Sequence, residues 1–262
     1  DEQTFNPALT QGEQQFVEEM LAALDVFPAY YAHMGPSNSA GPAAVDLSLP
    51  EPADPDELRR RIDAGEWVVD LRSREIYAQG HLRGSLSFDL DGAFIAYLSW
   101  LIPWGMPVTL LGETTEQVEA AQREMVRIGI DRPAAQAVGG LEYWVREDQD
   151  DVATMDRIDF AGLAKVLAEK PDAFVVDTRQ VLEWRDGHVE GATFVPFYEV
   201  LDRLDEFPGD RAAYVYCGSG YRAAAVASLL QREGRPVVHV DDDFGNAAEA
   251  GLTIVPAAHD LT

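Results

Sequence analysis

The chain has 262 residues, of which 47% are hydrophobic and 10% aromatic, which is typical of a globular protein long enough for two domains. Its 20 basic and 46 acidic side chains give a formal net charge of −26, which argues against binding nucleic acid through phosphate neutralisation. The one cysteine excludes a disulfide within the chain and a dithiol redox cycle.

The first 50 residues differ in pattern from the rest and are predicted to form an N-terminal extension. Apolar residues at helical spacing, such as Phe16, Met20 and Leu24, predict a helix over residues 13–24. Residues 28–55 are rich in Pro, Gly, Ser and Ala, which predicts an irregular linker. No apolar run approaches the ~20 residues that cross a bilayer, and no basic-then-apolar export signal is present. We therefore expect a cytoplasmic protein without a membrane partner.

Two segments then match without a gap at a spacing of 107 residues, from Trp67 to Ser85 and from Phe174 to Ala192. Each has an apolar run that predicts a buried strand, followed by Asp-x-Arg, a nearby Glu, and Gly-His-x-x-Gly. The match predicts a duplicated domain. The residues taken as counterparts are Asp70 and Asp177, Arg72 and Arg179, Glu75 and Glu183, and His81 and His188.

Each copy continues with a strand and a helix, predicted over residues 108–111 and 115–128 in the first and 213–216 and 222–233 in the second. Closing strands are predicted within 132–138 and 237–240, and residues 148–151 form a polar bridge. Strands alternating with helices predict an α/β fold with mainly parallel sheets, whose functional residues lie beyond the carboxyl ends of strands. We divide the chain into the extension (1–50), a first domain (51–148) and a second domain (149–262).

The cysteine lies between the predicted strand 213–216 and the helix that follows, in the loop Cys217-Gly218-Ser219-Gly220-Tyr221-Arg222. Amides of a glycine-bearing loop, the positive end of the helix and the guanidinium of Arg222 all favour a thiolate there. A thiolate is a nucleophile. A lone cysteine is equally compatible with a buried small apolar side chain.

Together the duplicated motif and the cysteine loop resemble the rhodanese family of sulfurtransferases over about residues 53 to 256. The resemblance implies two domains, each a five-stranded parallel sheet flanked by helices, and a sulfane sulfur carried as a persulfide on Cys217. The six-residue loop has the length associated with sulfur transfer, whereas related phosphatases use one residue more. The first copy has Leu111-Gly112-Glu113-Thr114-Thr115 at this place and no cysteine, so we expect it to be a structural partner.

The extension has a resemblance of its own. Asn6-Pro7-Ala8-Leu9 and Pro28-Ala29-Tyr30-Tyr31 resemble the tail of metallo-β-lactamase-fold proteins that are fused to tandem rhodanese domains and related to persulfide dioxygenases. This implies a metal domain ahead of the present chain. The sequence itself has no His-rich metal motif, so we expect neither a metal site nor a cofactor within it.

The resemblance assigns the nucleophile to Cys217 and assigns binding of the substrate to Gly218, Ser219, Gly220 and Tyr221, whose amides would hold the outer sulfur. Arg222 has two candidate roles, which are pairing with an anionic donor and pairing with a nearby acid. Supporting roles are expected for residues whose counterparts persist in the copy without cysteine. These are Asp177, Arg179, Glu183 and His188.

Two further features of the second copy bear on the pocket. Asp241, Asp242 and Asp243 come close to the expected pocket rim, which counts against strong binding of an anionic donor. The aromatic residues are candidates for either the pocket border or the core. They are Trp184, Phe194, Phe197 and Tyr198.

The sequence thus predicts a sulfurtransferase that moves sulfur from thiosulfate or a low-molecular-weight persulfide through Cys217 to cyanide, glutathione or another thiol. One alternative is a 3-mercaptopyruvate sulfurtransferase, although Tyr221-Arg222 departs from the loop ending of that group. Another is a non-catalytic binding or regulatory module that docks a partner. A phosphatase or arsenate reductase is disfavoured by the short loop and the single thiol.

Overall fold

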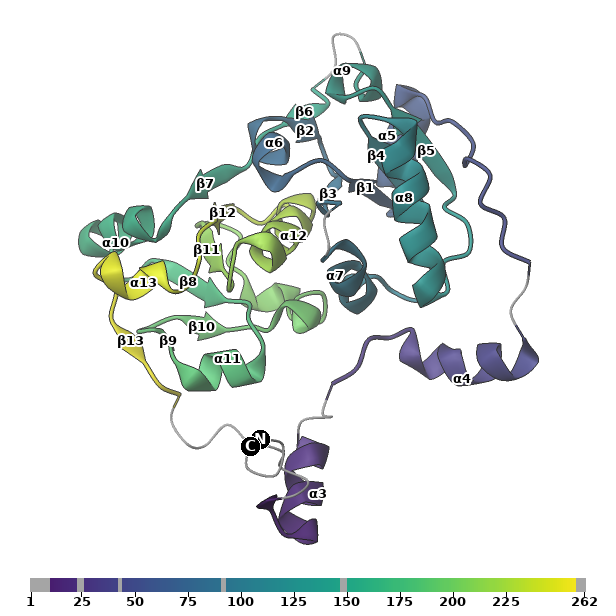
Figure 1. Ribbon diagram of the computed structural model, residues 1–262. Coiled ribbons are helices and arrows are strands. Elements are labelled where there is room, and N and C mark those ends of the chain that lie inside the picture. The colour runs from purple at the N-terminus through teal and green to yellow at the C-terminus, as the bar shows by residue number, and fades with distance from the viewer. Residues whose placement is uncertain (1–9, 23–25, 42–43, 91–92, 147–149, 258–262) are drawn as a thin grey trace.

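The computed structural model describes residues 10–22, 26–41, 44–90, 93–146 and 150–257, which form two α/β units preceded by an extension (Figure 1). The units follow each other in the chain, as the duplicated sequence predicts. None of the helices in these ranges is long and apolar enough to cross a membrane.

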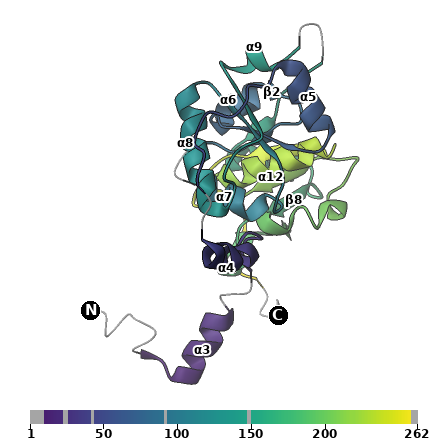
Figure 2. The same ribbon diagram turned by 90° about the vertical axis from the view of Figure 1, so that its right-hand side faces the viewer.

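The described residues of the extension form two helices, where the sequence predicts one. The predicted helix is present as α3 (Glu13–Ala22), which lies apart from both units (Figures 1 and 2). The prediction of an irregular linker was wrong over α4 (Tyr31–Ala40), which continues through Pro36. His33 stacks on Trp104 of the first unit with ring centroids 4.0 Å apart. Such tertiary contacts stabilise a helix against weak local propensity.

The first unit is built on a parallel sheet in the order β3-β1-β4-β5. Its helices are α5 (Pro55–Asp63), α6 (Arg74–Gln79), α7 (Phe94–Leu101), α8 (Thr115–Met125) and α9 (Leu141–Trp144), and a 3-10 turn covers Val126–Ile128. Its strands are β1 (Trp67–Asp70), β2 (His81–Leu82), β3 (Leu86–Ser87), β4 (Val108–Gly112) and β5 (Ala135–Val138). Pro52 forms a single parallel bridge to Gln136 at the outer edge, in the place of a fifth strand.

The second unit has a five-stranded parallel sheet in the order β10-β8-β11-β12-β7. Its strands are β7 (Asp156–Ile158), β8 (Phe174–Asp177), β9 (His188–Val189), β10 (Thr193–Phe194), β11 (Ala213–Tyr216), β12 (Val237–Val240) and β13 (Ile254–Val255). Its helices are α10 (Phe160–Glu169), α11 (Val181–Asp186), α12 (Tyr221–Arg232) and α13 (Asn246–Glu249), with 3-10 turns at Phe197–Glu199 and Leu204–Glu206. The predicted α/β fold class with parallel sheets is confirmed. The expected five strands are present in the second sheet, whereas the first sheet has four among the described residues.

The duplication extends to small details outside the main sheets. β2 pairs antiparallel with β6 (Val152–Ala153), and β9 pairs in the same way with β13. The predicted polar bridge leads into β6. There Asp150 is exposed, whereas Asp151 is buried and accepts a hydrogen bond from Arg146 Nε at 2.7 Å.

Helix α12 joins the two units. Its residues from Tyr221 to Leu230 are all buried, because α12 lies between its own sheet and β3 of the first unit (Figures 1 and 2). Many of them are alanines, which let the neighbouring chains approach closely. Ser87 N donates to Ser228 Oγ at 3.0 Å across the boundary. One hydrophobic cluster therefore contains residues of both units, among them Leu86, Leu229 and Cys217.

Candidate functional site

Cys217 directly follows β11, which pairs with β8 on one side and β12 on the other. Gly220 has φ +88°, a left-handed conformation that glycine adopts without strain, and it is the residue directly before α12. The cysteine thus lies at the carboxyl end of a central strand and the amino end of a buried helix, where backbone N–H groups favour an anion. Its side chain is 1% exposed, and Ser219 is the exposed residue of the loop.

Arg222 forms a bidentate ion pair with Glu183 of α11, with N···O distances of 2.5 and 2.7 Å. Burial alone lowers the pKa of Arg222, but the hydrogen bonds to Glu183 and the charge of Cys217 raise it above its usual range. Burial likewise raises the pKa of Glu183, and the bonds from Arg222 and from the Gln180 amide bring it below its usual range. Of its two candidate roles, the structure shows Arg222 paired with an acid.

The comparison of Glu183 with Glu75 was wrong. The 107-residue spacing places Ile76, not Glu75, at the position of Glu183. Glu75 is 41% exposed and lies 3.8 Å from Arg74 and from Arg157. Glu183 therefore belongs to the cysteine-bearing copy alone, and a strict count of the spacing is the signal that identifies it.

Asp177, Arg179 and His188 bind the turns around strand β8 in the way that their counterparts do around β1. Arg179 Nη2 donates to Asp177 at 2.7 Å and to the Gly187 carbonyl at 2.6 Å, and the corresponding distances for Arg72 are 2.6 and 2.9 Å. His188 Nδ1 lies 3.2 Å from the Trp184 carbonyl. Contacts shared with the copy that has no cysteine support a structural role.

Phe244 links the framework formed by Asp177, Arg179 and His188 to the cysteine loop. The guanidinium of Arg179 lies 3.6 Å from the centre of the Phe244 ring, and Phe244 N donates to the Gly218 carbonyl at 2.9 Å. The framework thus holds the first half of the loop.

The acidic run beside the loop is engaged by hydrogen-bond donors. Asp241 pairs with Arg74 Nε at 2.8 Å and with Arg157 Nη1 at 2.6 Å. Asp242 accepts hydrogen bonds from Phe160 N and the Asn246 side chain, and Asp243 accepts one from Gly245 N. Most of the negative charge that Asp241 would present to a donor is therefore balanced by two guanidinium groups.

Aromatic side chains of both units lie beside the site. Tyr97 of α7 packs edge-on against Phe197 at 5.5 Å between ring centroids, and the guanidinium of Arg222 lies 5.9 and 6.0 Å from these two rings. The hydroxyl of Tyr221 donates to the Asp89 carbonyl. The apolar pattern of α7 gives no sign of this role. Of the predicted aromatic set, Phe197 borders the site, whereas Trp184 stacks on His188 at 3.3 Å.

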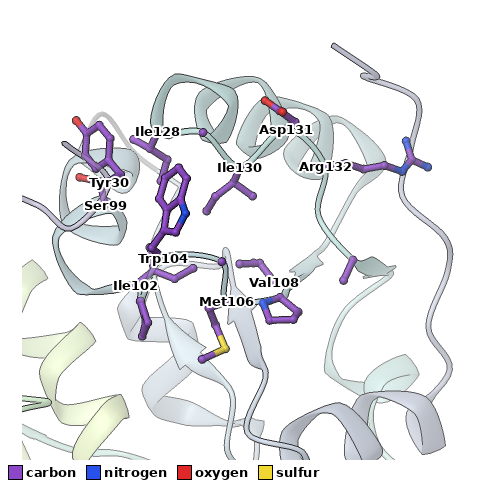
Figure 3. A pocket seen from close by; sticks show the side chains of 15 residues that line it. Tyr30, Ser99, Ile102, Trp104, Met106, Val108, Ile128, Ile130, Asp131 and Arg132 are labelled. Carbon is purple, nitrogen blue, oxygen red and sulfur yellow. The ribbon is translucent and has the colours of Figure 1, made fainter. Parts of the chain in front are cut away.

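A cavity of about 470 Å³ lies in the first unit, at the amino end of β4 and away from Cys217. Figure 3 shows Trp104 near its middle, with Tyr30 and Ile128 beside it and Arg132 at the opposite rim. Across the described ranges, no group of three or more His, Cys, Asp or Glu side chains is placed to hold a metal ion.

Comparisons with known proteins agree with this architecture. The family model for the rhodanese-like domain matches residues 54–147 and 161–249, more than half of the chain. The HTH-type transcriptional regulator Rv0324 of Mycobacterium tuberculosis is 33% identical over 96 residues, which are 35% of this chain and 42% of that protein. This chain covers 36% to 49% of the length of the curated relatives that it matches.

Solved structures of other proteins are similar in part, and two of them show how far the similarity extends. A rhodanese-like domain protein of Staphylococcus aureus is 28% identical, with a TM-score of 0.36, and the match covers 38% of this chain and 99% of that one. A thiosulfate sulfurtransferase of Pseudomonas aeruginosa is 16% identical, with a TM-score of 0.36, and the match covers 79% of this chain and 44% of that one.

Proposed function

Because the chain belongs to the family of proteins with rhodanese-like domains and contains two of them, we propose that it is a sulfurtransferase that carries sulfane sulfur on Cys217. The observation that carries the proposal is the position of Cys217 between the end of β11 and the start of α12. The thiol is there in the second copy only, beside the buried cation Arg222.

The proposed reaction has two steps. The thiolate of Cys217 attacks the sulfane sulfur of thiosulfate, the sulfur–sulfur bond of thiosulfate breaks, and sulfite leaves with the bonding electron pair. The cysteine is left as an anionic persulfide, whose outer sulfur the loop amides of Gly218 to Arg222 stabilise. Cyanide or a thiolate then takes the outer sulfur and restores the Cys217 thiolate.

Sulfur transfer in this structure requires a local opening. Cys217 is 1% exposed and Arg222 is occupied by Glu183, so an anionic donor has to enter beside the exposed Ser219 and compete with a carboxylate. We propose that the donor and the acceptor are small sulfur compounds, that the reaction needs no cofactor or metal in this chain, and that it takes place in the cytoplasm.

Intact mass after incubation with thiosulfate tests the reaction. The wild-type protein should gain about 32 Da, the mass of one sulfur, and should lose it on addition of cyanide. Cys217→Ser should gain nothing while it keeps the fold. Absence of the gain in the wild-type protein, or an equal gain in the Ser variant, contradicts the proposal. Turnover with thiosulfate and with 3-mercaptopyruvate then identifies the preferred donor.

The burial of Cys217 favours a second candidate, a non-catalytic binding or regulatory module. In that case the thiol serves as a core side chain of the cluster that it shares with Leu86 and Leu229. This candidate predicts no mass gain with thiosulfate, and alkylation of Cys217 by iodoacetamide no faster than global unfolding.

The resemblance of residues 6–42 supports a separate proposal, that the chain is the C-terminal part of a fusion with a metallo-β-lactamase-fold domain. The coding sequence upstream of Asp1 tests it. A His-rich metal-binding domain in the same reading frame is the expected result, and a start codon directly before Asp1 contradicts it.

A further inference from the structure

Arg74 belongs to the copy without the cysteine, yet its side chain reaches the loop of the other copy. It begins α6, its Nε donates to Asp241 Oδ1 at 2.8 Å, and its Nη2 lies 3.4 Å from the Ser219 carbonyl oxygen. At the 107-residue spacing the second copy has Val181 in this position. The duplicated framework therefore does not account for the contact.

Asp241, which accepts the hydrogen bond from Arg74, also lies against the loop backbone at Gly220. Its side chain is 6% exposed and also accepts a hydrogen bond from Arg157 Nη1. Gly220 lies so close that a Cβ added to it would overlap Asp241 Oδ1. Burial raises the pKa of Asp241, but the hydrogen bond from Arg74, the charges around it and the bond from Arg157 bring it below its usual range, so the carboxylate stays charged.

His239 holds the same glycine from strand β12. Its Nε2 donates to the Gly220 carbonyl at 2.8 Å. The carbonyls of Ser219 and Gly220 are thus both held by side chains outside the loop. Because the C=O and N–H of a trans peptide point in opposite directions, the amide hydrogens of Gly220 and Tyr221 turn away from these partners.

We propose that Arg74, through Asp241 and the Ser219 carbonyl, is a positioning residue that directs the loop amides toward the sulfur on Cys217. The proposal rests on the proposed sulfur transfer and adds to it a contribution from the cysteine-less domain. An outer persulfide sulfur needs N–H donors that are already aimed at it, and a displaced peptide group lowers the rate without unfolding the protein. The first domain then supplies part of the site.

Arg74→Met and Arg157→Met in the full chain form a matched pair, because each removes one guanidinium from Asp241 and only the first removes the contact with the loop. Sulfur loading from thiosulfate is followed by intact mass in a single turnover. We expect Arg74→Met to slow loading about tenfold or more, and Arg157→Met to slow it less than about threefold. Arg74→Lys should restore part of the rate, since a lysine keeps the charge without the planar fork.

Equal slowing by the two Met variants, or loading of Arg74→Met at the wild-type rate, overturns the proposal. Amide hydrogen exchange in a peptide covering residues 217–222 separates it from the function itself. Exchange there should be faster in Arg74→Met than in the wild type and unchanged in Arg157→Met. If the wild-type protein takes up no sulfur, the sulfurtransferase proposal fails, and the exchange result still decides whether Arg74 positions the loop. Unchanged exchange in Arg74→Met overturns the positioning role.

Discussion

Arg222 is the cation of the cysteine loop, and Glu183 already occupies its guanidinium. In the proposed reaction, an anionic donor would therefore meet a neutral pair in a mostly buried setting, where breaking the pair costs more than it would in water. Selectivity for donors then depends on what can compete with a carboxylate. Thiosulfate brings two negative charges to the competition with Glu183 for Arg222, whereas a persulfide with little charge brings fewer.

Glu183→Gln removes this competition and keeps the shape of the side chain. We expect the KM for thiosulfate to fall about threefold or more, because Arg222 regains free donors, and the free energy of unfolding to fall by about 1 to 2 kcal/mol, because a hydrogen bond to a charged group is weakened. Steady-state kinetics and urea titration measure the two effects. A higher KM in the variant would show that Glu183 assists the donor instead of competing with it.

His239 makes the stability of the protein depend on pH. Burial lowers its pKa to about 4, whereas a histidine in the unfolded chain titrates near 6.5. As the pH falls from about 6.5 to about 4, the unfolded chain binds a proton that the folded protein does not, and this contribution to stability is progressively lost. The pKa of its neighbour Asp241 is lowered, so this carboxylate keeps its charge over most of the range.

We therefore expect the free energy of unfolding to be about 2 kcal/mol lower at pH 5 than at pH 7. His239→Gln should remove this contribution and leave a weaker dependence, because the pKa of the buried His81 is also lowered and His81 still titrates. Urea titrations of both proteins at the two pH values provide the measurement. An unchanged pH dependence in the variant assigns the effect to other groups.

Helix α12 contacts both sheets, and its polar residues meet specific partners in the first unit. Ser228 Oγ accepts from the buried Ser87 N and donates to the carbonyl of Ala225 within its own helix. Ala residues around it leave little volume for rearrangement. The helix is thus bound to a definite position relative to β3.

Ser228→Ala should lower the free energy of unfolding by about 1 to 3 kcal/mol, since it leaves the Ser87 N–H without its acceptor. Ser99→Ala is the matched control, because Ser99 Oγ donates to the Ala96 carbonyl of its own helix α7. We expect less than about 1 kcal/mol for this control. Guanidinium titrations compare the two, and equal losses would argue against the contact between α12 and β3.

Local patterns predicted most of the elements but few of the contacts that form the site. The strand at 237–240 and the helices beginning near Thr115 and Tyr221 follow from apolar runs and helical spacing. Helix α4 was missed because its Pro and Gly content is typical of a linker, and its contact with Trp104 is one that no local pattern encodes. The pairs of Arg222 with Glu183 and Arg74 with Asp241 join residues 39 and 167 positions apart, which no local pattern encodes.

The two domains share one hydrophobic cluster, from Phe88 and Leu98 in the first to Val195 and Leu230 in the second. Separating the two domains would expose this apolar surface to water, which costs a free energy of about 25 cal/mol per Å² of exposed area. Each domain also has a smaller cluster of its own, around Trp144 in the first and Tyr216 in the second, so only the shared part of the core depends on both domains.

We expect the protein to unfold in a single cooperative transition. In calorimetry, the calorimetric and van't Hoff enthalpies should agree, because the shared cluster couples the two units. Two resolved transitions, or a calorimetric enthalpy clearly above the van't Hoff value, would show that the units unfold independently.

The all-round burial of α12 also constrains how such a protein can change over generations. A helix whose every face is in contact tolerates few substitutions, and a change that suits one neighbour disturbs the other. If recombination replaced one of the two domains with a copy from another protein, the new domain would not pack correctly at this helix. The two halves are thus expected to be inherited and exchanged as a single block.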